Sequence, residues 1–164
     1  MPEIVLIAHN LRSTHNVGSL LRTAEGLGLA KVYLTGYTPY PAHSHETRLP
    51  HLADKLTAQI HKTALGAENL IAWEHHDDVF SVMTKLRRHD YVIAALEQAE
   101  NSLDLSTYKS PGKVALIVGR EVEGMESEVL AACDVALEIP MRGHKESFNV
   151  VQAAAMALYH LSQA

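Results

Sequence analysis

Three short segments of the sequence combine polar side chains with glycines in a way that could build one binding or catalytic site. They are HNLRSTHNVGSLLR (9–22), VGREVEGM (118–125) and IPMRGHKESFN (139–149). Glycine lets a backbone approach a ligand closely, while carboxylate, amide, hydroxyl and guanidinium groups can orient a substrate and move its protons. The residues of interest in these segments are Asn16, Gly18, Arg22, Gly119, Glu121, Gly124, Gly143, Ser147 and Asn149.

The same segments concentrate positive charge in an otherwise acidic protein. The formal net charge of −5 argues against non-specific nucleic-acid binding. A local basic site instead suits an anionic ligand held at one place, and arginine is well matched to phosphate. Alternatively, these cations are solvated loop charges paired with Glu121, Glu123 and Glu146. The basic residues concerned are Arg12, Arg22, Arg120, Arg142 and Lys145.

Other kinds of site lack their sequence patterns. No glycine-rich dinucleotide motif follows the first strand, and neither a P-loop nor a G-x-S-x-G motif occurs. The single cysteine, Cys133, excludes an internal disulfide, and its apolar neighbours predict a buried, inert thiol. The 11 histidines include no H-E-x-x-H pattern. They are therefore interpreted as solvated loop residues, and no metal site is predicted.

Strand-like and helix-like patterns alternate along the chain. The composition, 47% apolar and 20% charged, is that of a globular protein, and one domain covering 1–164 is expected. The alternation predicts an α/β fold, a mainly parallel sheet with helices on both faces. Since the carboxyl ends of parallel strands share one edge, the three segments should meet there. Strands are predicted at 3–8, 31–35, 69–74, 91–96, 113–118 and 135–139, and helices at 17–27, 51–63, 77–89, 121–133 and after Ser147.

Helix caps and the last helix give further expectations. Asn16 and Ser147 are predicted to cap the first and last helices, because short polar side chains accept hydrogen bonds from free N–H groups. The last helix is too apolar to face water on all sides, so it should pack on the sheet and against a second subunit. Neither a membrane-spanning run nor a signal peptide is recognised, which predicts a cytoplasmic protein.

In order and spacing, the three segments resemble the three motifs of the SpoU/TrmH-like branch of the SPOUT RNA methyltransferases. The matching stretches are NVGSLLRTAEGLG, LIVGREVEGM and IPMRGHKESFNVVQAAAMALY. The family patterns are N-x-G-x-x-x-R-x-A, F-G-x-E-x-x-G-L and I-P-M-x-G-x-x-x-S-L-N-V-x-x-A. No polar motif residue is lost. The departures are Val118, Met125, Phe148 and Gln152.

The resemblance implies a fold, a cofactor and a reaction. It implies a deep C-terminal trefoil knot threaded by the last helix, with S-adenosylmethionine bound in the knot. It implies a homodimer, expected here through the first and last helices, that methylates a ribose 2′-hydroxyl of tRNA or, less favoured, rRNA. Nothing extends the domain for substrate binding, so the minimal catalytic form is expected.

The resemblance also implies roles for individual residues. The cofactor would contact Leu96, Gly119, Ile139, Met141 and Ser147. Arg22, from the partner subunit, would hold the phosphate beside the target ribose. It could also help remove the 2′-hydroxyl proton, although arginine is a poor base. The catalytic set is Arg22, Asn16, Glu121, Ser147 and Asn149, and the RNA-binding set is Arg12, Arg22, Arg120, Arg142 and Lys145.

Each role has a structural alternative. Arg22 could pair with Glu25 on its own helix. Asn16 could cap its helix and do nothing else, while Ser147 and Asn149 could simply cap and buttress the last helix. For the whole protein, the alternatives are a non-catalytic RNA-binding or ribosome-assembly factor with the same fold, and a SPOUT enzyme that methylates a base nitrogen.

Overall fold

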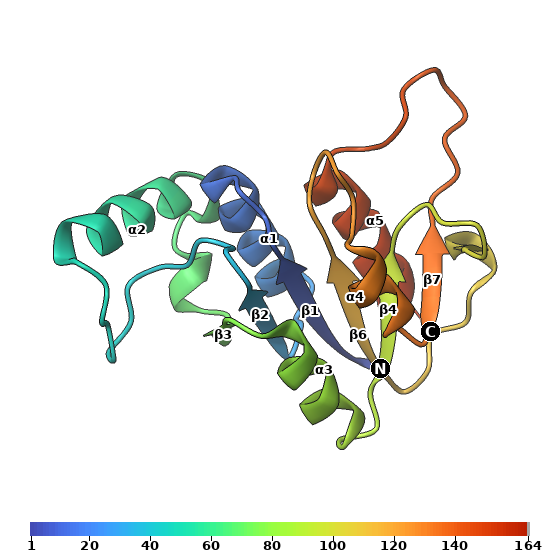
Figure 1. The fold of residues 1–164 in the computed structure, drawn as a ribbon, viewed down its shortest axis with the longest axis horizontal. Helices are drawn as coiled ribbons and strands as arrows, with labels where there is room; N and C mark the ends of the chain where they lie inside the picture. Colours follow the sequence, from blue (N-terminus) through green and yellow to red (C-terminus); the bar gives the residue numbers. More distant parts are fainter. Residues whose placement is uncertain (164) are drawn as a thin grey trace.

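Seven parallel strands form the central sheet of the computed structural model, which describes residues 1–163 (Figure 1). Their order across the sheet is β3-β2-β1-β6-β4-β7-β5. This confirms the predicted α/β fold with a parallel sheet. The strands are β1 (Glu3–His9), β2 (Lys31–Thr35), β3 (Trp73–His76), β4 (Val92–Leu96), β5 (Leu103–Asp104), β6 (Lys113–Val118) and β7 (Val135–Glu138).

The two central strands are apolar because both faces of the sheet are covered. In β1 every residue from Ile4 to His9 is buried, and in β6 the same holds from Val114 to Val118. Leu6 of β1 pairs in register with Leu116 of β6. A continuous apolar run of this kind is typical of a parallel strand that has helices on both sides.

The helices divide between the two faces. α1 and α5 cover one face, with α2 packed on α1, and α3 and α4 cover the other (Figure 1). The helices are α1 (Thr14–Gly26), α2 (Pro50–Ala64), α3 (Val79–Arg87), α4 (Ser127–Ala131) and α5 (Val150–Ser162), and short 3-10 turns span Ala67–Asn69 and Leu105–Thr107.

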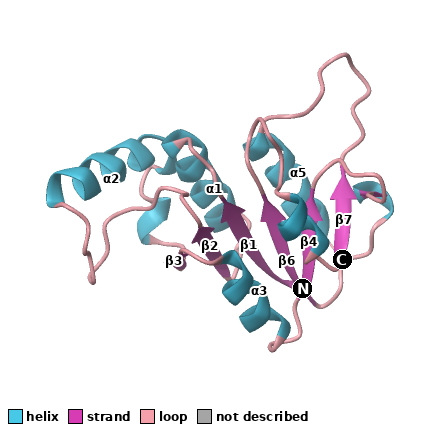
Figure 2. Cartoon of the chain, viewed as in Figure 1, coloured by secondary structure: helices cyan, strands magenta, loops and turns pink. Residues whose placement is uncertain are grey.

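The C-terminal half of the chain re-enters the sheet after it has reached the edge. β5 is the edge strand, yet the following β6 lies between β1 and β4, and β7 lies between β4 and β5. After β7 a long loop, 139–149, extends beyond the sheet before the chain enters α5, as Figure 2 shows. α5 then packs against α1 and the central strands β1, β4 and β6.

Gly18 permits the close contact between α1 and α2. A Cβ atom at this position would lie 2.1 Å from Thr63 Oγ1 and 2.2 Å from the backbone oxygen of Ile60. Both atoms belong to α2, so the two helices can approach this closely only with glycine here. Gly18 is therefore used for the packing of the two helices. It sets the position of α1, which carries Asn16 and Arg22.

Several predicted elements differ in extent from the structure. The expected strand 69–74 is displaced: a 3-10 turn takes Ala67–Asn69, and β3 begins at Trp73, which pairs with Val32. The expected helix 121–133 shrinks to α4, because Arg120 and Gly124 form a bridge that closes a tight turn before it. Gly124 has a φ of +74°, which an ordinary side chain would strain.

Both predicted caps are displaced. Ser13 caps α1, and its hydroxyl accepts a hydrogen bond from Asn16 N, so the backbone of Asn16 is already inside the first turn. Asn149, and not Ser147, caps α5: its side-chain oxygen accepts from Val151 N at 2.8 Å. Ser147 stays in the preceding loop and is free for another role. Within residues 1–163, none of the helices has the length and apolar character needed to cross a membrane.

Candidate active site

The first and second polar segments meet at the carboxyl edge of β1 and β6. Asn16 Nδ2 donates a hydrogen bond to Glu121 Oε1 at 3.3 Å. Asn10 Nδ2 donates to Glu126 Oε1 at 2.8 Å. The two pairs join residues more than a hundred positions apart in the chain, so the predicted meeting of these segments is confirmed.

The second and third segments enclose a cavity of about 260 Å³ at the same edge. Leu96, Gly119, Ile139 and Ser147, four of the predicted cofactor-binding residues, line it. Met141, the fifth, lies on the 139–149 loop and is not among the lining residues. The other lining residues are Glu97, Gln98, Val118, Arg120, Glu121, Val122, Gly124, Glu138, Glu146, Phe148, Val150 and Ala153.

One wall of this cavity is a turn over residues 119–126. Glu97, which follows β4, holds this turn by a hydrogen bond. Glu97 Oε2 accepts a hydrogen bond from Met125 N at 2.8 Å. The turn passes close to its own start, because a Cβ at Gly119 would lie 3.1 Å from Met125 Cα. A Cβ at Gly124 would lie 3.0 Å from Glu97 Oε2. Both glycines therefore allow close packing within the wall.

Glu126 fastens the other side of the same turn. Its carboxylate accepts from Asn10, lies 3.5 Å from Arg120 Nε and 3.5 Å from His9 Nε2, and its Oε2 is buried without a hydrogen bond. Burial raises the pKa of Glu126, but the bond from Asn10, its own N–H and the nearby cations outweigh this, and the pKa is lowered. The carboxylate is therefore ionised at neutral pH.

His9 is buried between Glu126 and Thr35. Its Nδ1 lies 2.9 Å from Thr35 Oγ1, within hydrogen-bond distance. Burial lowers the pKa of His9 by more than the charge of Glu126 raises it. His9 is accordingly neutral at pH 7 and supports the turn as a buried polar group.

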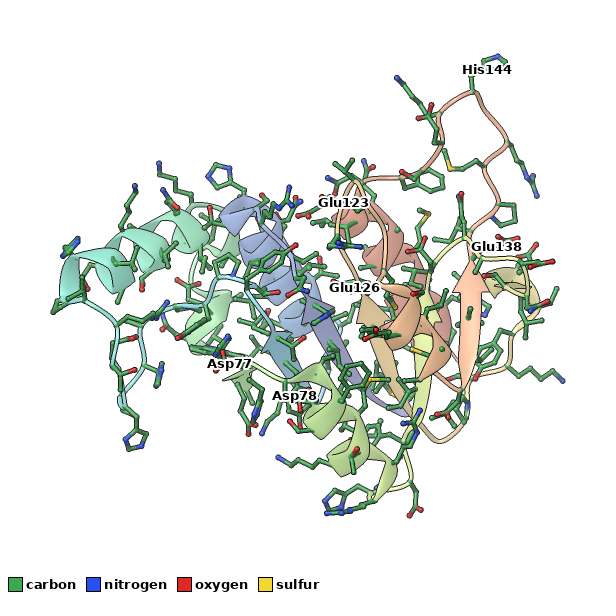
Figure 3. All side chains as sticks on the ribbon, viewed as in Figure 1. Asp77, Asp78, Glu123, Glu126, Glu138 and His144 are labelled. Atoms are coloured by element: carbon green, nitrogen blue, oxygen red, sulfur yellow. The ribbon has the colours of Figure 1, made fainter. Side chains whose placement is uncertain are left out.

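Most of the charged residues that line the cavity are acids. Glu97, Glu121, Glu138 and Glu146 all contribute to its walls. Arg120 is the one basic lining residue, and its Nε donates to the backbone oxygen of Gly124 at 2.9 Å. Figure 3 shows Glu138 at the end of β7, and Glu123 and Glu126 on the turn that follows β6. Such a cavity suits a cationic ligand better than an anionic one.

The remaining predicted residues lie around the cavity. Arg22 is exposed on α1 and has no ion-pair partner within residues 1–163, so the alternative pairing with Glu25 does not form. Arg12 is also exposed and pairs with Glu123 at 3.0 Å. Asn149 is used as the α5 cap. Arg142 and Lys145 are exposed on the 139–149 loop, whose tip is marked by His144 in Figure 3.

Sequence reasoning missed two residues that shape the site, Glu97 and Glu126. Glu97 directly follows the fourth strand, at the same edge as the three segments, and this position was a usable signal. Glu126 follows the second segment and is separated from Asn10 by 116 positions. Nothing in the sequence pattern pairs these two residues.

Similar solved structures define the class of fold. The fold matches that of the SpoU methyltransferase AviRb from Streptomyces viridochromogenes in complex with AdoMet, with a TM-score of 0.81 and 20% identity. That match covers 99% of this chain and 57% of the other. An RNA 2′-O ribose methyltransferase matches with a TM-score of 0.78 and 23% identity, covering 99% and 58%. The architecture is the knotted α/β fold of the SPOUT class, as the sequence motifs predicted.

The family follows from the sequence as a whole. The model of the SpoU rRNA Methylase family matches residues 3–159, and the chain belongs to that family. A curated relative from Staphylococcus haemolyticus, named for the TrmH family of tRNA/rRNA methyltransferases, is 28% identical over 157 residues. The match covers 96% of this chain and 57% of the relative, so the chain spans little more than half of that protein's length.

Proposed function

We propose that this protein transfers a methyl group from S-adenosylmethionine to a ribose 2′-hydroxyl of tRNA or rRNA, with tRNA favoured. The observation that supports this best is the meeting of three family motifs around one cavity at the carboxyl edge of the sheet. Residues 1–164 are proposed to act as one methyltransferase domain, in the cytoplasm.

The cavity between the second and third motifs is the proposed cofactor site. Its apolar residues, among them Leu96 and Ile139, suit the adenosine part of the cofactor, and its carboxylates suit the positive sulfonium. Gly119 and Ser147 bring backbone and hydroxyl groups to the same space. Met141 is proposed to join them through the exposed 139–149 loop. When bound, the cofactor supplies an electrophilic methyl group.

The proposed catalytic residues orient the ribose and handle its proton. In-line methyl transfer requires the 2′-oxygen to be aligned with the methyl carbon as the hydroxyl proton leaves. Glu121 lines the cavity and accepts a hydrogen bond from Asn16, which fixes its carboxylate at the opening. Ser147 also lines the cavity, and Asn149, two residues further on, caps the start of α5.

Arg22 is proposed to bind the phosphate next to the target ribose, in the active site of the partner subunit. Arg22 is exposed and pairs with no acid among residues 1–163, which leaves its guanidinium available for that contact. We assign Arg22 to positioning and not to proton removal, because a guanidinium stays protonated at neutral pH. Arg12, Arg142 and Lys145 are proposed to bind other phosphates, and Arg120 to contribute charge from the wall of the cavity.

A homodimer through α1 and α5 is part of the proposal. α5 leaves the large side chains of Met156 and Tyr159 exposed, 40% and 59%, although the helix is otherwise apolar. Burying such side chains against a second copy would remove apolar surface from water. The dimer would also bring Arg22 of one subunit toward the cofactor cavity of the other.

Isothermal titration calorimetry combined with a methylation assay tests the proposal. Wild-type protein should bind about one S-adenosylmethionine per subunit and methylate RNA from a strain that lacks the gene. Arg22→Ala should keep cofactor affinity within about twofold and lose about a hundredfold or more in turnover, because a lost charge-assisted phosphate contact misplaces the ribose. Equal loss of binding and turnover in this variant would contradict the division of roles.

The second candidate is a non-catalytic RNA-binding factor with the same fold. Calorimetry distinguishes it from the proposed methyltransferase, because an RNA-binding scaffold does not need to bind S-adenosylmethionine. Retention of RNA binding without any binding of S-adenosylmethionine, with or without RNA present, would favour this candidate. A third candidate, a base-nitrogen methyltransferase, would bind the cofactor but leave the methyl group on a base.

A further inference from the structure

A second cavity lies on the other side of the 119–126 turn. It is a cleft of about 620 Å³ at the carboxyl edge of β1, β2 and β3. Arg12 on its rim pairs at 3.0 Å with Glu123 of the turn whose residues also line the proposed cofactor cavity. The turn therefore lies between the two cavities, as β6 lies between β1 and β4 in the sheet. Among the residues that line the cleft are Arg12, Tyr37, Tyr40, Arg48, His75 and Asp77.

The back of the cleft is a rigid aromatic stack. The rings of Tyr40 and His75 are stacked, with centroids 3.9 Å apart and planes at 20°, and Arg48 covers the Tyr40 ring at 3.6 Å. Arg48 is held in turn by Glu46, which it contacts through Nε and Nη2 at 2.7 Å each. A charge-assisted double contact of this kind fixes the guanidinium plane. The stack is thus ordered without any ligand.

Tyr37 is presented at the mouth of the cleft by a fixed backbone. Asn10 Oδ1 accepts a hydrogen bond from Tyr37 N at 3.0 Å, while Asn10 Nδ2 donates to Glu126 at the end of the 119–126 turn. Gly36 makes this possible, because its φ is +64° and a Cβ there would lie 1.9 Å from Asn10 Oδ1. The side chain of Tyr37 is nevertheless 52% exposed. An exposed aromatic ring whose backbone is held in place by a hydrogen bond can stack against a planar ligand such as a base.

The charged residues that line the cleft are mostly basic, whereas those that line the cofactor cavity are mostly acidic. Asp77 is the one acid among its lining residues, against Arg12 and Arg48. Figure 3 labels Asp77 near β3 and Glu123 on the turn that follows β6. Arg12 has a side chain 69% exposed, so its pair with Glu123 is a surface pair of small net energy. A phosphate can therefore replace Glu123 as the partner of Arg12 at little cost.

We propose that this cleft binds an unpaired nucleotide of the substrate RNA next to the methylated one, with its base stacked on Tyr37 and its phosphate at Arg12. This inference rests on the proposed RNA substrate. The position of the turn supports it, because the Arg12–Glu123 pair places the rim of the cleft against this turn, and a strand whose ribose lies at the cofactor cavity would pass the turn to reach the cleft. Unpaired bases are the usual target of aromatic and arginine side chains in RNA recognition.

The test measures RNA affinity by fluorescence anisotropy with two probes, unmodified bulk tRNA and a labelled single-stranded RNA oligonucleotide of mixed sequence. Tyr37→Ala should weaken binding about 5- to 100-fold, the range for loss of one stacked base. Tyr37→Phe keeps the ring and should remain within about twofold of wild type. Phe80→Ala is the matched control, because Phe80 is 41% exposed on α3, on the opposite face of the sheet.

The outcomes separate this inference from the proposed function. The proposal that the cleft binds a nucleotide is overturned if wild type and Tyr37→Ala have equal RNA affinity, or if wild type does not bind RNA. If wild type methylates RNA and Tyr37→Ala has the same RNA affinity and activity, the proposed function stands and the proposed nucleotide site in the cleft is wrong. If Tyr37→Ala weakens RNA binding but wild type transfers no methyl group, the cleft stands and the proposed function fails. Affinity for S-adenosylmethionine should be unchanged in all three variants.

Discussion

The substitution Gly18→Ala tests whether α1 is positioned by its contact with α2. The added Cβ would lie 2.2 Å from the backbone oxygen of Ile60 and 2.1 Å from Thr63 Oγ1, far inside the 3.0 Å that real Cβ contacts respect. Thr63 could rotate, but its hydroxyl also donates to His15 O at 2.7 Å. The backbone oxygen of Ile60 can move only if the whole of α2 shifts.

The magnitude follows from two opposing effects. Alanine is favoured over glycine in a helix by about 1 kcal/mol. Overpacking of a close contact costs about 1–3 kcal/mol, and a clash with backbone belongs at or above the upper end. The free energy of unfolding should therefore fall by about 2 kcal/mol. For a protein of this size, that corresponds to a decrease in Tm of about 4–8 °C.

Chemical denaturation and thermal melting would measure the effect, with Gly26→Ala as the control. Gly26 is the last residue of the same helix, and a Cβ there meets nothing within 4 Å. Gly26→Ala should leave stability unchanged or raise it by up to about 1 kcal/mol. If Gly18→Ala were as stable as Gly26→Ala, the close approach of α1 and α2 would be refuted, and with it the account of how Asn16 and Arg22 are placed.

Two further predictions concern the wall of the cofactor cavity. Glu97→Ala removes the acceptor for Met125 N and should weaken S-adenosylmethionine binding about fivefold or more, while Glu97→Gln keeps an acceptor oxygen and most of the affinity; equal loss in both would indicate that charge, and not the hydrogen bond, matters. Burial lowers the pKa of His9 in the folded protein below its usual 6.5. At a pH between the pKa of the folded protein and 6.5, the unfolded chain therefore binds a proton at His9 that the folded protein does not. Stability should therefore fall as the pH is lowered through 6.5, and His9→Gln should flatten that slope in urea unfolding at pH 5.5 and 7.5; parallel slopes would count against the buried neutral histidine.

The sequence predicted the central strands well because burial dictates their composition. β1, β2 and β6 lie where the apolar runs indicated. A parallel strand that is covered on both faces needs apolar side chains at nearly every position, so its sequence is easy to recognise. The run 69–74 misled because its apolar residues Leu70, Ile71 and Ala72 lie in the loop after the 3-10 turn, and β3 begins only at Trp73. Apolar character alone does not give the register with the neighbouring strand.

The site was predicted as three loops but not as a set of contacts. The motifs located Asn16, Glu121 and Ser147 at one edge, and the parallel sheet explains why they meet. The support given by Glu97 and Glu126 depends on hydrogen bonds between distant segments, which spacing cannot reveal. The cap positions failed for a related reason: several polar residues precede each helix, and the path of the entering loop selects among them.

The most direct test of the proposed reaction is to identify the methylated nucleoside. RNA incubated with the protein and isotopically labelled S-adenosylmethionine would be digested to nucleosides and analysed by mass spectrometry. We predict a labelled 2′-O-methylribonucleoside that is produced by wild type and is absent with Arg22→Ala. Label found on a base, or no transfer by a protein that binds both the cofactor and RNA, would contradict the assignment of this site to ribose methylation.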